Sequence, residues 1–315
     1  MKIEKNLELV SKLEEKVRVD QFISLNSELS RSMLSDKSVV ITIDGKTAKR
    51  SSMVHCGQIV KVVFEQYVFD GIEKENIALN VLFEDKDILV INKEQNMVVH
   101  PAPGNFTGTL VNALAYRYGN EFVEDMKEDD DLTRPGIVHR LDKDTSGVMV
   151  IALNWKSHNN LSLQFASHTT EKIYNCIVKG VFLQTRGKIE NFIGRNPRNR
   201  KSFSVVENEK KGRYALSYYR VIQQFKEYAL VEVIIKTGRT HQIRVHMKHI
   251  GHPILGDTTY SKIDSKFPDA SMMLHARSLS FNHPETGERM SFETELPERF
   301  NQILKALDLI TLNLR

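Results

Sequence analysis

The 315-residue sequence has few of the features that mark secreted, membrane or thiolate-metal proteins. Its two cysteines, Cys56 and Cys176, lie far apart, which excludes a dense disulfide framework and a paired-cysteine metal motif. Residues 1–16 mix lysine with glutamate and contain no apolar segment of a signal peptide. No apolar run reaches the roughly 18 residues that a membrane helix needs. These absences predict a cytoplasmic protein that makes no membrane contact.

The formal net charge is only +4, but the charges are unevenly distributed. Residues 16–65 carry eight lysines and arginines against five acids, a net of +3, and residues 195–220 carry eight against two, a net of +6. Residues 121–131 carry one against seven, a net of −6, and are predicted to form a disordered surface loop. One basic run alone would indicate no more than a solvated face, whereas two within a nearly neutral remainder favour a surface that binds a polyanion.

The N-terminal part of the chain predicts a short charged lead-in followed by a small folded unit. The lead-in, residues 1–16, is expected to be frayed. In residues 17–65, two short helices precede a strand at 39–43, and the pair Asp44-Gly45 is a strong signal for a hairpin turn. A further strand at residues 58–64 completes this unit.

Residues 66–78 lack clear periodicity and are predicted to be a linker to a larger second domain, residues 79–315. In this domain strands and helices follow one another without the regular βαβ rhythm of a doubly wound fold, which predicts a mixed, mainly antiparallel α+β sheet. The strands are expected at residues 81–91, 174–179, 214–223 and 228–236. The helices are expected at residues 109–118, 159–168, 241–250 and 297–307.

The segment GIVHRLDKDTSG, residues 136–147, carries the most informative carboxylate. Residues 137–141 are predicted to be a short strand, on which alternation places Arg140 and Asp142 on one face. The chain then turns and enters a buried strand at residues 148–153. Asp142 thus ends a strand, a favoured place for a side chain that faces a substrate. From spacing alone, a salt-bridged aspartate in a turn explains the pattern better, because one carboxylate is no catalytic signature.

The stretch HRLDKDTSG resembles the active-site sequence of the RluA-type pseudouridine synthase family. Further segments match this family in its own order over roughly residues 78–300. They are residues 81–108, Lys172-Ile-Tyr174, TGRTHQIRVH at 237–246, IGHPILGD at 250–257, Leu274-His-Ala and Phe281-Asn-His-Pro. The run Glu94-Gln95-Asn96-Met97 departs from the family, which usually has a proline and a glycine in this turn.

The resemblance implies an enzyme that isomerises uridine in RNA to pseudouridine and needs no cofactor. Asp142 would be the nucleophile, with attack at the ribose C1′, attack at the ring C6 and a glycal-like intermediate all open. Tyr174 would lie against the target ring, and Arg239 would pair with Asp142 and keep it ionised. Arg140 would fill the gap left by the flipped nucleotide. Ile243 and Leu274 would help to form the apolar wall of the base pocket, although packing in the core explains either residue equally well.

The resemblance assigns both basic segments to RNA. Residues 193–203, with Lys210-Lys-Gly-Arg213 nearby, resemble a hairpin that grips RNA from one side. Phe203 beside them would stack on a base or pack internally. Residues 17–65 resemble an S4-type RNA-binding module, although the second helix is short. The expected contacts are Arg195, Arg198, Arg200, Lys201 and His241 in the second domain, and Arg31, Lys37, Lys46, Lys49 and Arg50 in the first.

An S4-like module joined to a synthase domain implies a large, folded RNA as the substrate. Large-subunit (23S) ribosomal RNA is the expected substrate, and transfer RNA is the alternative. The protein is expected to act as a monomer.

Three other interpretations are weighed against this one. The histidines His241, His246, His249 and His252 suggest a zinc site, but no carboxylate or thiolate stands at a suitable spacing beside them, so no metal is expected. A hydrolase would need a second positioned carboxylate or a nucleophilic serine, and the sequence has no GxSxG segment. A catalytically silent RNA-binding factor would predict the loss of an active-site residue, whereas Asp142, Tyr174 and Arg239 are all present.

Overall fold

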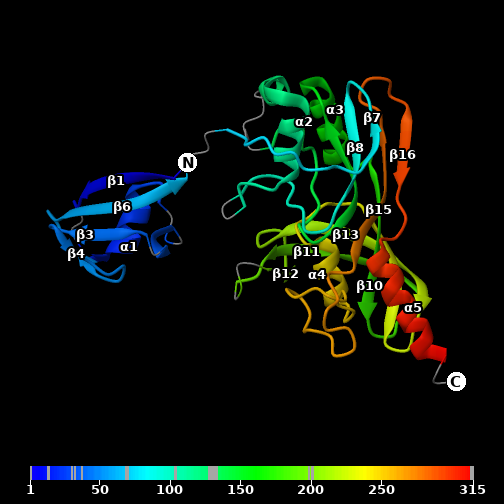
Figure 1. Ribbon diagram of the computed structural model, residues 1–315. Coiled ribbons are helices and arrows are strands. Elements are labelled where there is room, and N and C mark those ends of the chain that lie inside the picture. Colours follow the sequence, from blue (N-terminus) through cyan, green and yellow to red (C-terminus); the bar gives the residue numbers. More distant parts are fainter. Residues whose placement is uncertain are drawn as a thin grey trace. The chain divides into compact units, whose positions relative to one another are not determined.

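Contacts divide the chain into two units, Met1–Gly71 and Ile72–Arg315. The computed structural model describes residues 2–312 with the exception of residues 13–14, 30, 32, 37, 68–70, 103–104, 127–133, 198 and 200–201. Figure 1 shows both units, each with its own sheet. They are described separately below.

The N-terminal unit is built on an antiparallel sheet in the order β1-β6-β3-β4. Its first strand, β1 (Lys2–Val10), pairs with β6 (Ile59–Tyr67) over its whole length. The prediction of a frayed lead-in over residues 1–16 is therefore wrong. The alternating apolar side chains Leu7 and Leu9 pack against the core of the unit, which gives the strand a half-buried face despite its many charges.

The rest of the unit follows the sequence pattern closely. Helix α1 (Val19–Asn26) buries one face, and Asp44 and Gly45 both adopt positive φ in the predicted hairpin between β3 (Val40–Ile43) and β4 (Lys46–Thr47). The second predicted helix is reduced, among the described residues, to the single 3₁₀ turn η1 (Met33–Ser35). The short strands β2 (Val17–Arg18) and β5 (Met53–Val54) pair with each other.

Most of the predicted linker belongs to the second unit. The Asn112 side chain donates to the carbonyl of Glu73 at 2.8 Å, and the Glu75 carboxylate accepts from the backbone of Gly108 at 2.7 Å. These bonds fix the segment to the start of helix α2 (Leu110–Asp125). A linker over residues 66–78 is therefore too long at both ends, since β6 continues to Tyr67.

Among the described residues, the second unit has one sheet of ten strands in the order β12-β11-β13-β14-β10-β15-β9-β8-β7, with β16 on β15. Among its described strands, the one parallel pair is β9 with β15, so the predicted mixed, mainly antiparallel sheet is confirmed. The strands are β7 (Val81–Glu84), β8 (Ile88–Lys93), β9 (Ser146–Ala152), β10 (Glu171–Lys179), β11 (Arg186–Arg195), β12 (Phe203–Val206), β13 (Arg213–Gln224), β14 (Tyr228–Ile235), β15 (Leu274–Asn282) and β16 (Arg289–Glu293).

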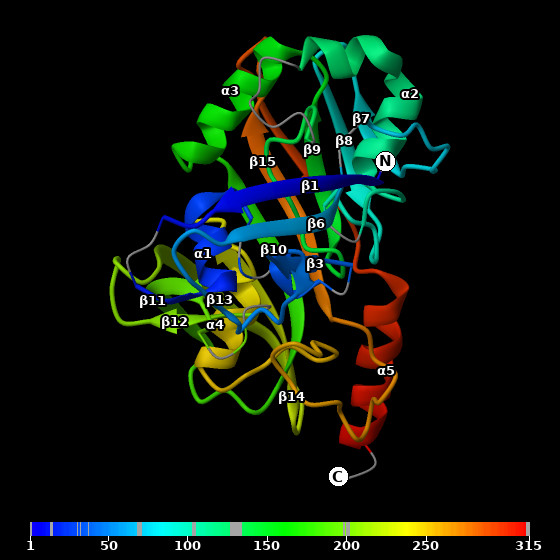
Figure 2. The same cartoon turned by 90° about the vertical axis from the view of Figure 1, so that its left-hand side faces the viewer.

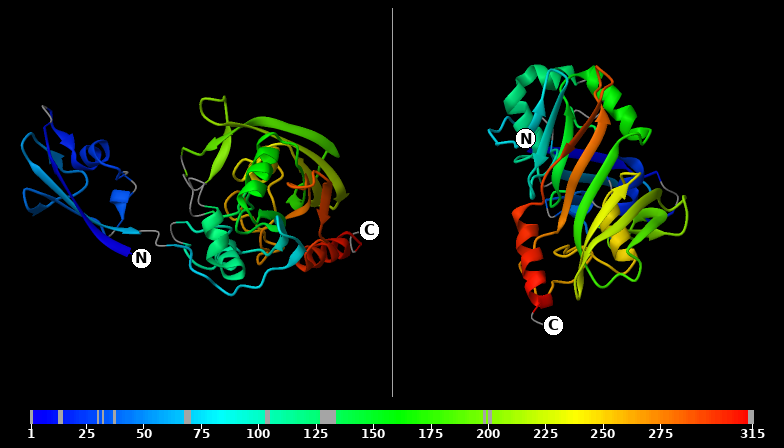
Figure 3. Two further views of the ribbon diagram at one scale, coloured as in Figure 1. Left: turned by 90° about the horizontal axis from the view of Figure 1, so that it is seen from above. Right: turned by 90° about the vertical axis from the view of Figure 1, so that its right-hand side faces the viewer.

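Helices cover different parts of this sheet. Helix α3 (Trp155–Ala166) packs on β9 and β15, and α4 (Gln242–His249) packs on β11, β12 and β13. Helix α5 (Glu298–Leu312) lies at the opposite end of the unit from α2 and α3, as the red ribbon shows in Figures 2 and 3. Helix α2 continues into the acidic run that was predicted to be a loop, of which residues 127–133 lie outside the described residues.

The two adjacent strands β8 and β9 form the centre of the larger core. Every residue of β9 is buried, and so is nearly every residue of β8. Each fully buried isoleucine or valine contributes roughly 1.5–3 kcal/mol. This fixed pair of strands supports the loop that precedes β9, and that loop carries Asp142.

Candidate active site

The segment before Asp142 lies along the edge of β9 but is not a strand. The backbone of Ala152 donates to the carbonyl of Gly136 at 3.0 Å, and the backbone of Val150 donates to Nε2 of His139 at 3.1 Å. Because a side chain takes the place of a strand carbonyl, no β-ladder forms here. The predicted strand at residues 137–141 is therefore wrong, although Arg140 and Asp142 do line one cavity.

The chain turns sharply between Asp142 and β9. The backbone of Thr145 donates to the carbonyl of Asp142 at 3.1 Å. At Gly147 the φ angle is +125°, and a Cβ atom would lie 2.2 Å from the carbonyl oxygen of Ala276 in β15. Only glycine fits this close approach. The last residue of the HRLDKDTSG segment thus lets β15 pair beside the loop.

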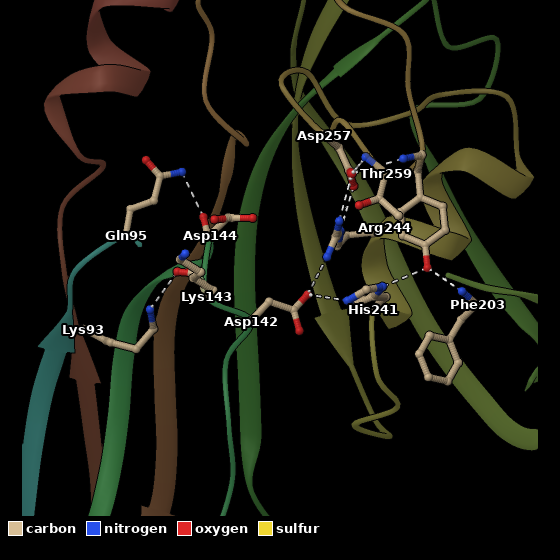
Figure 4. A network of polar contacts seen from close by, with 11 residues as sticks. Lys93, Gln95, Asp142, Lys143, Asp144, Phe203, His241, Arg244, Asp257 and Thr259 are labelled. Carbon is tan, nitrogen blue, oxygen red and sulfur yellow. Dashed lines mark hydrogen bonds and ion pairs between the residues drawn. The ribbon is translucent and has the colours of Figure 1, made fainter. Parts of the chain in front are cut away.

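Two side chains, from the last residue of β8 and from the turn after it, hold this loop from the other side. The buried Lys93 ammonium donates to the carbonyls of Glu94, Met97 and Lys143 at 2.7, 3.0 and 3.3 Å. The Gln95 amide donates to the carbonyls of Asp144 and Met272 at 2.9 and 3.1 Å. Both clamps appear in Figure 4. In the turn at residues 94–97, where the family usually has a glycine, Asn96 adopts a φ of +69°. Asparagine tolerates this left-handed conformation better than most residues do.

Asp142 pairs with Arg244, not with Arg239. Nη1 of Arg244 lies 3.0 Å from Oδ2 of Asp142, while its Nε and Nη2 bind Asp257 at 2.7 and 2.9 Å (Figure 4). The Asp257 side chain has no exposed surface. Burial alone would lower the pKa of Arg244, but the two carboxylates outweigh it and raise that pKa, so the guanidinium remains charged beside Asp142.

Helix geometry explains why the predicted partner is wrong. Arg239 lies in the turn before α4, where its Nε donates to the carbonyl of Tyr214 at 2.8 Å. Arg244 lies within α4 and is buried against the site. The second arginine of TGRTHQIRVH was available in the sequence, and its position inside a predicted helix was the signal that could have favoured it.

A cavity of about 110 Å³ opens beside Asp142. Its apolar wall includes Ile243 and Leu274, together with the ring of Tyr174. The side chain of Asp142 lines this cavity and is 22% exposed. Burial, followed by the charge of Asp142, raises the pKa of Tyr174, so its hydroxyl keeps its proton at neutral pH. The site therefore presents a carboxylate, a neutral phenol and a fixed guanidinium to a small planar ring. Its lining residues are Arg140, Leu141, Asp142, Thr145, Tyr174, Ile235, Gly238, Arg239, Thr240, His241, Gln242, Ile243, Arg244 and Leu274.

Comparison with known proteins assigns this site to a family. The family model described as RNA pseudouridylate synthase matches residues 87–249. The chain belongs to this family. It is 41% identical to an uncharacterized RNA pseudouridine synthase of Aquifex aeolicus, over 98% of this chain and 99% of that protein. It is 40% identical to the ribosomal large subunit pseudouridine synthase D of Pseudomonas aeruginosa, over 92% of each chain.

A solved structure agrees with the fold of the second unit. The human RNA pseudouridylate synthase domain containing 1 is 25% identical and aligns with a TM-score of 0.56, over 74% of this chain and 96% of that one. The protein is therefore a pseudouridine synthase with a mixed α+β catalytic domain. In the described part of the synthase, no helix is long and apolar enough to cross a membrane.

Cationic side chains surround the mouth of the site. Arg140 is exposed at the cavity, with Nη1 3.3 Å from Nε2 of His100. Arg239 lines the same cavity. Farther out, the guanidinium of the exposed Arg195 lies 5.5 Å from the ring of Phe203, which packs in a small apolar cluster with Tyr260. We call Arg140, Arg239 and Arg195 the basic rim. The predicted contacts Arg198, Arg200 and Lys201 lie outside the described residues.

The four histidines of the zinc hypothesis do not share one centre. His241 binds the Tyr260 hydroxyl, His246 binds Ser217 and Asn191, and Nδ1 of His252 bonds the carbonyl of Lys179. Within the described residues, the one group whose geometry could hold a metal is Asp85, Asp87 and His283. Asp85 and His283 already bond each other and nearby backbone amides, joining the turn after β7 to that after β15. The Asp87 carboxylate accepts from the side chains of Asn154 and Ser157.

The basic residues predicted in the N-terminal unit are exposed. Lys46 lies in β4 and Arg50 in the turn that follows, both open to solvent. Arg31 lies 3.4 Å from Asp20, which also binds Arg18 at 2.9 Å. The hydrogen bond from Arg18 lowers the pKa of Asp20, so the carboxylate stays ionised and orients both arginines. Lys37 lies outside the described residues.

Proposed function

We propose that Asp142 is the nucleophile of this pseudouridine synthase and that large-subunit (23S) ribosomal RNA is its substrate. The observation that carries the first part is the placement of the Asp142 carboxylate in a ring-sized cavity, where Nη1 of Arg244 donates to it at 3.0 Å. The reaction breaks the N1–C1′ bond of uridine, rotates the base and forms a C5–C1′ bond with loss of the C5 proton. A carboxylate suits attack at C1′, attack at C6 and a glycal-like intermediate alike, because it can act as a nucleophile or as a base.

The surrounding residues support defined roles in this reaction. The neutral Tyr174 would lie against the uracil ring and exchange a proton with it, because its raised pKa keeps the hydroxyl protonated. Arg140, exposed at the mouth of the cavity, would occupy the space left in the RNA by the flipped nucleotide. Arg244 would orient Asp142 in the role first expected of Arg239.

Two observations support the ribosomal substrate. Relatives named ribosomal large subunit pseudouridine synthase D match more than 90% of the chain, including most of the N-terminal unit. That unit presents Arg31, Lys46 and Arg50 on its surface, as an S4-like module would present them to the phosphates of a folded RNA. RNA contacts along the basic rim and at His241 belong to the same proposal.

Tritium release from C5-labelled uridine tests the proposal directly, because formation of the C5–C1′ bond expels the C5 hydrogen. Wild-type protein and Asp142→Asn would be compared on unmodified 23S ribosomal RNA and on transfer RNA. We expect release from ribosomal RNA by the wild type, a loss of at least ~1,000-fold in Asp142→Asn, and unchanged RNA affinity. Turnover by Asp142→Asn would refute the nucleophile, and release from transfer RNA alone would refute the substrate.

A further inference from the structure

A series of polar contacts leads from Phe203 on β12, which pairs with Arg195 on β11, to the carboxylate of Asp142. The backbone N–H of Phe203, the first residue of β12, donates to the Tyr260 hydroxyl at 2.8 Å. That hydroxyl bonds Nδ1 of His241 at 2.8 Å, and Nε2 of the same ring lies 3.8 Å from Oδ2 of Asp142. Figure 4 shows these groups in sequence from Phe203 to Asp142.

The protonation of His241 and Tyr260 bears on which group donates in each of these hydrogen bonds. Burial lowers the pKa of His241, so the ring is neutral at neutral pH, and burial raises the pKa of Tyr260, whose hydroxyl keeps its proton. Tyr260 accepts from Phe203, and we assign its own O–H as the donor to Nδ1 of His241. This assignment places the imidazole proton on Nε2, where it faces Asp142. Each bond polarises the next toward the carboxylate.

Tyr260 also contacts the other partner of Asp142. Its ring lies 5.1 Å from the guanidinium carbon of Arg244, and its backbone N–H binds Asp257 at 3.2 Å. The side chain is 6% exposed, so these contacts are shielded from water. One tyrosine thereby touches the two side chains that face Asp142, Arg244 and His241, and also the backbone of β12.

Two features connect this network to RNA contact. Phe203 pairs in register with Arg195, so the residue that donates to Tyr260 sits opposite a basic-rim arginine. His241 precedes α4 with a φ of +57°, a conformation that costs a non-glycine residue on the order of 1 kcal/mol and is found mostly at functional sites. Its strained backbone aims the ring at both Tyr260 and Asp142.

We propose that Tyr260 and His241 are positioning residues that couple RNA contact at the β11–β12 hairpin to the orientation of Asp142. The gap of 3.8 Å between His241 and Asp142 is just longer than a hydrogen bond. When RNA binds at the hairpin, β12 moves and displaces Tyr260 and His241 with it. The Nε2–H of His241 then donates a hydrogen bond to the Asp142 carboxylate and fixes its orientation. This inference rests on the proposed roles of Asp142 and of the hairpin.

The test measures single-turnover tritium release at saturating RNA, together with RNA affinity, in the full chain. Tyr260→Phe removes the linking hydroxyl and keeps the ring against Arg244. We expect its saturating rate constant to fall about tenfold with little change in affinity. The matched control is Tyr228→Phe, since the Tyr228 hydroxyl also bonds a partner, Asp264 at 2.8 Å, away from the active site. This control should leave the rate constant unchanged.

Coupling itself is tested by combining variants. In the wild-type background, Arg195→Glu should lower both the RNA affinity and the saturating rate constant. In the Tyr260→Phe background it should lower the affinity alone, because the contacts that link β12 to Asp142 are already broken. Additive effects on the rate constant, or a wild-type rate in Tyr260→Phe, would overturn the coupling. If Tyr260→Phe unfolds, His241→Asn serves instead, since asparagine tolerates positive φ. Absence of release by the wild type, or activity in Asp142→Asn, would instead refute the proposed function.

Discussion

Asp142 stands between two regions that use the same residue types in opposite ways. On one side lies the buried wall, which we define as Arg244, Asp257 and Tyr260, where every charged group has a partner within about hydrogen-bond distance and little contact with water. On the other side lies the basic rim, whose arginines face the cavity mouth or solvent. A charge in the wall fixes geometry, whereas a charge in the rim is available to a ligand.

The difference is one of dielectric environment. A buried carboxylate or guanidinium that loses its partner leaves an uncompensated charge, at a cost of roughly 3–5 kcal/mol. An exposed charge that is removed is replaced by water, and the cost is about 0–1 kcal/mol. Variants in the wall should therefore change turnover and stability. Variants in the rim should change RNA binding, and should change turnover only through the contacts of Tyr260 and His241 proposed above. The predictions below test that division, from the largest expected effect to the smallest.

Arg244→Gln should have the largest effect, because it removes a partner from Asp142 and from the buried Asp257 together. We expect turnover to fall by at least about 100-fold, since a displaced catalytic group can cost that much, and stability to fall measurably. Single-turnover kinetics and denaturant unfolding would measure both. Arg239→Gln is the matched control in the same motif and should reduce turnover far less. Equal losses in the two variants would contradict the assignment of Arg244 as the partner of Asp142.

Asp257→Asn should come next, because it keeps the shape of the side chain and removes the charge that fixes Arg244. The unfolding free energy should fall by about 3–5 kcal/mol, with a lower rate constant and unchanged RNA affinity. Asp264→Asn offers a control, since that carboxylate is also largely buried and pairs with Lys179 at 2.9 Å. The control should lose stability but keep its rate constant. A normal rate in Asp257→Asn would show that the wall does not orient Asp142.

Arg195→Glu should have the smallest effect on the folded protein and act on RNA binding. Because Arg195 is exposed, the unfolding free energy of this variant should differ from that of the wild type by less than about 1 kcal/mol. RNA affinity should fall, and the dependence of log affinity on log salt should become shallower by about one phosphate contact. Filter binding at several salt concentrations would measure this. Arg186→Glu makes the same charge change at the far end of β11, and an equal effect there would mean that net charge alone is responsible.

Local signals in the sequence were sufficient for much of the fold. The Asp44-Gly45 turn, the capped helix after Thr109 and the β-branched runs of β9 and β14 each follow from short-range preferences of the backbone. The strand β1 was missed because its charges obscure the alternation, and its buried face exists only once β6 lies beside it. The segment at residues 137–141 has a strand-like composition, but the His139 side chain takes the bond that a strand would use.

The active site shows the same division. The residues Asp142 and Tyr174 could be chosen from the sequence because both stand in segments that resemble those of the family. The partner of Asp142 could not, because Arg239 and Arg244 are both arginines in one motif and only the placement of α4 separates them. The roles of Lys93, Gln95 and Tyr260 were equally invisible, since each bonds groups far away in the chain.

By itself, the sequence determined the type of protein: the strand and helix preferences, the family motifs, the carboxylate proposed as the nucleophile and the clustering of positive charge. Tertiary structure alone decided which groups face one another around Asp142. Backbone preferences and motifs depend on a few neighbouring residues, so short stretches of the sequence are enough to recognise them. The pairing of buried charges depends on which side chains the sheet and α4 bring within about 3 Å in a place without water, where each unpaired charge would be costly.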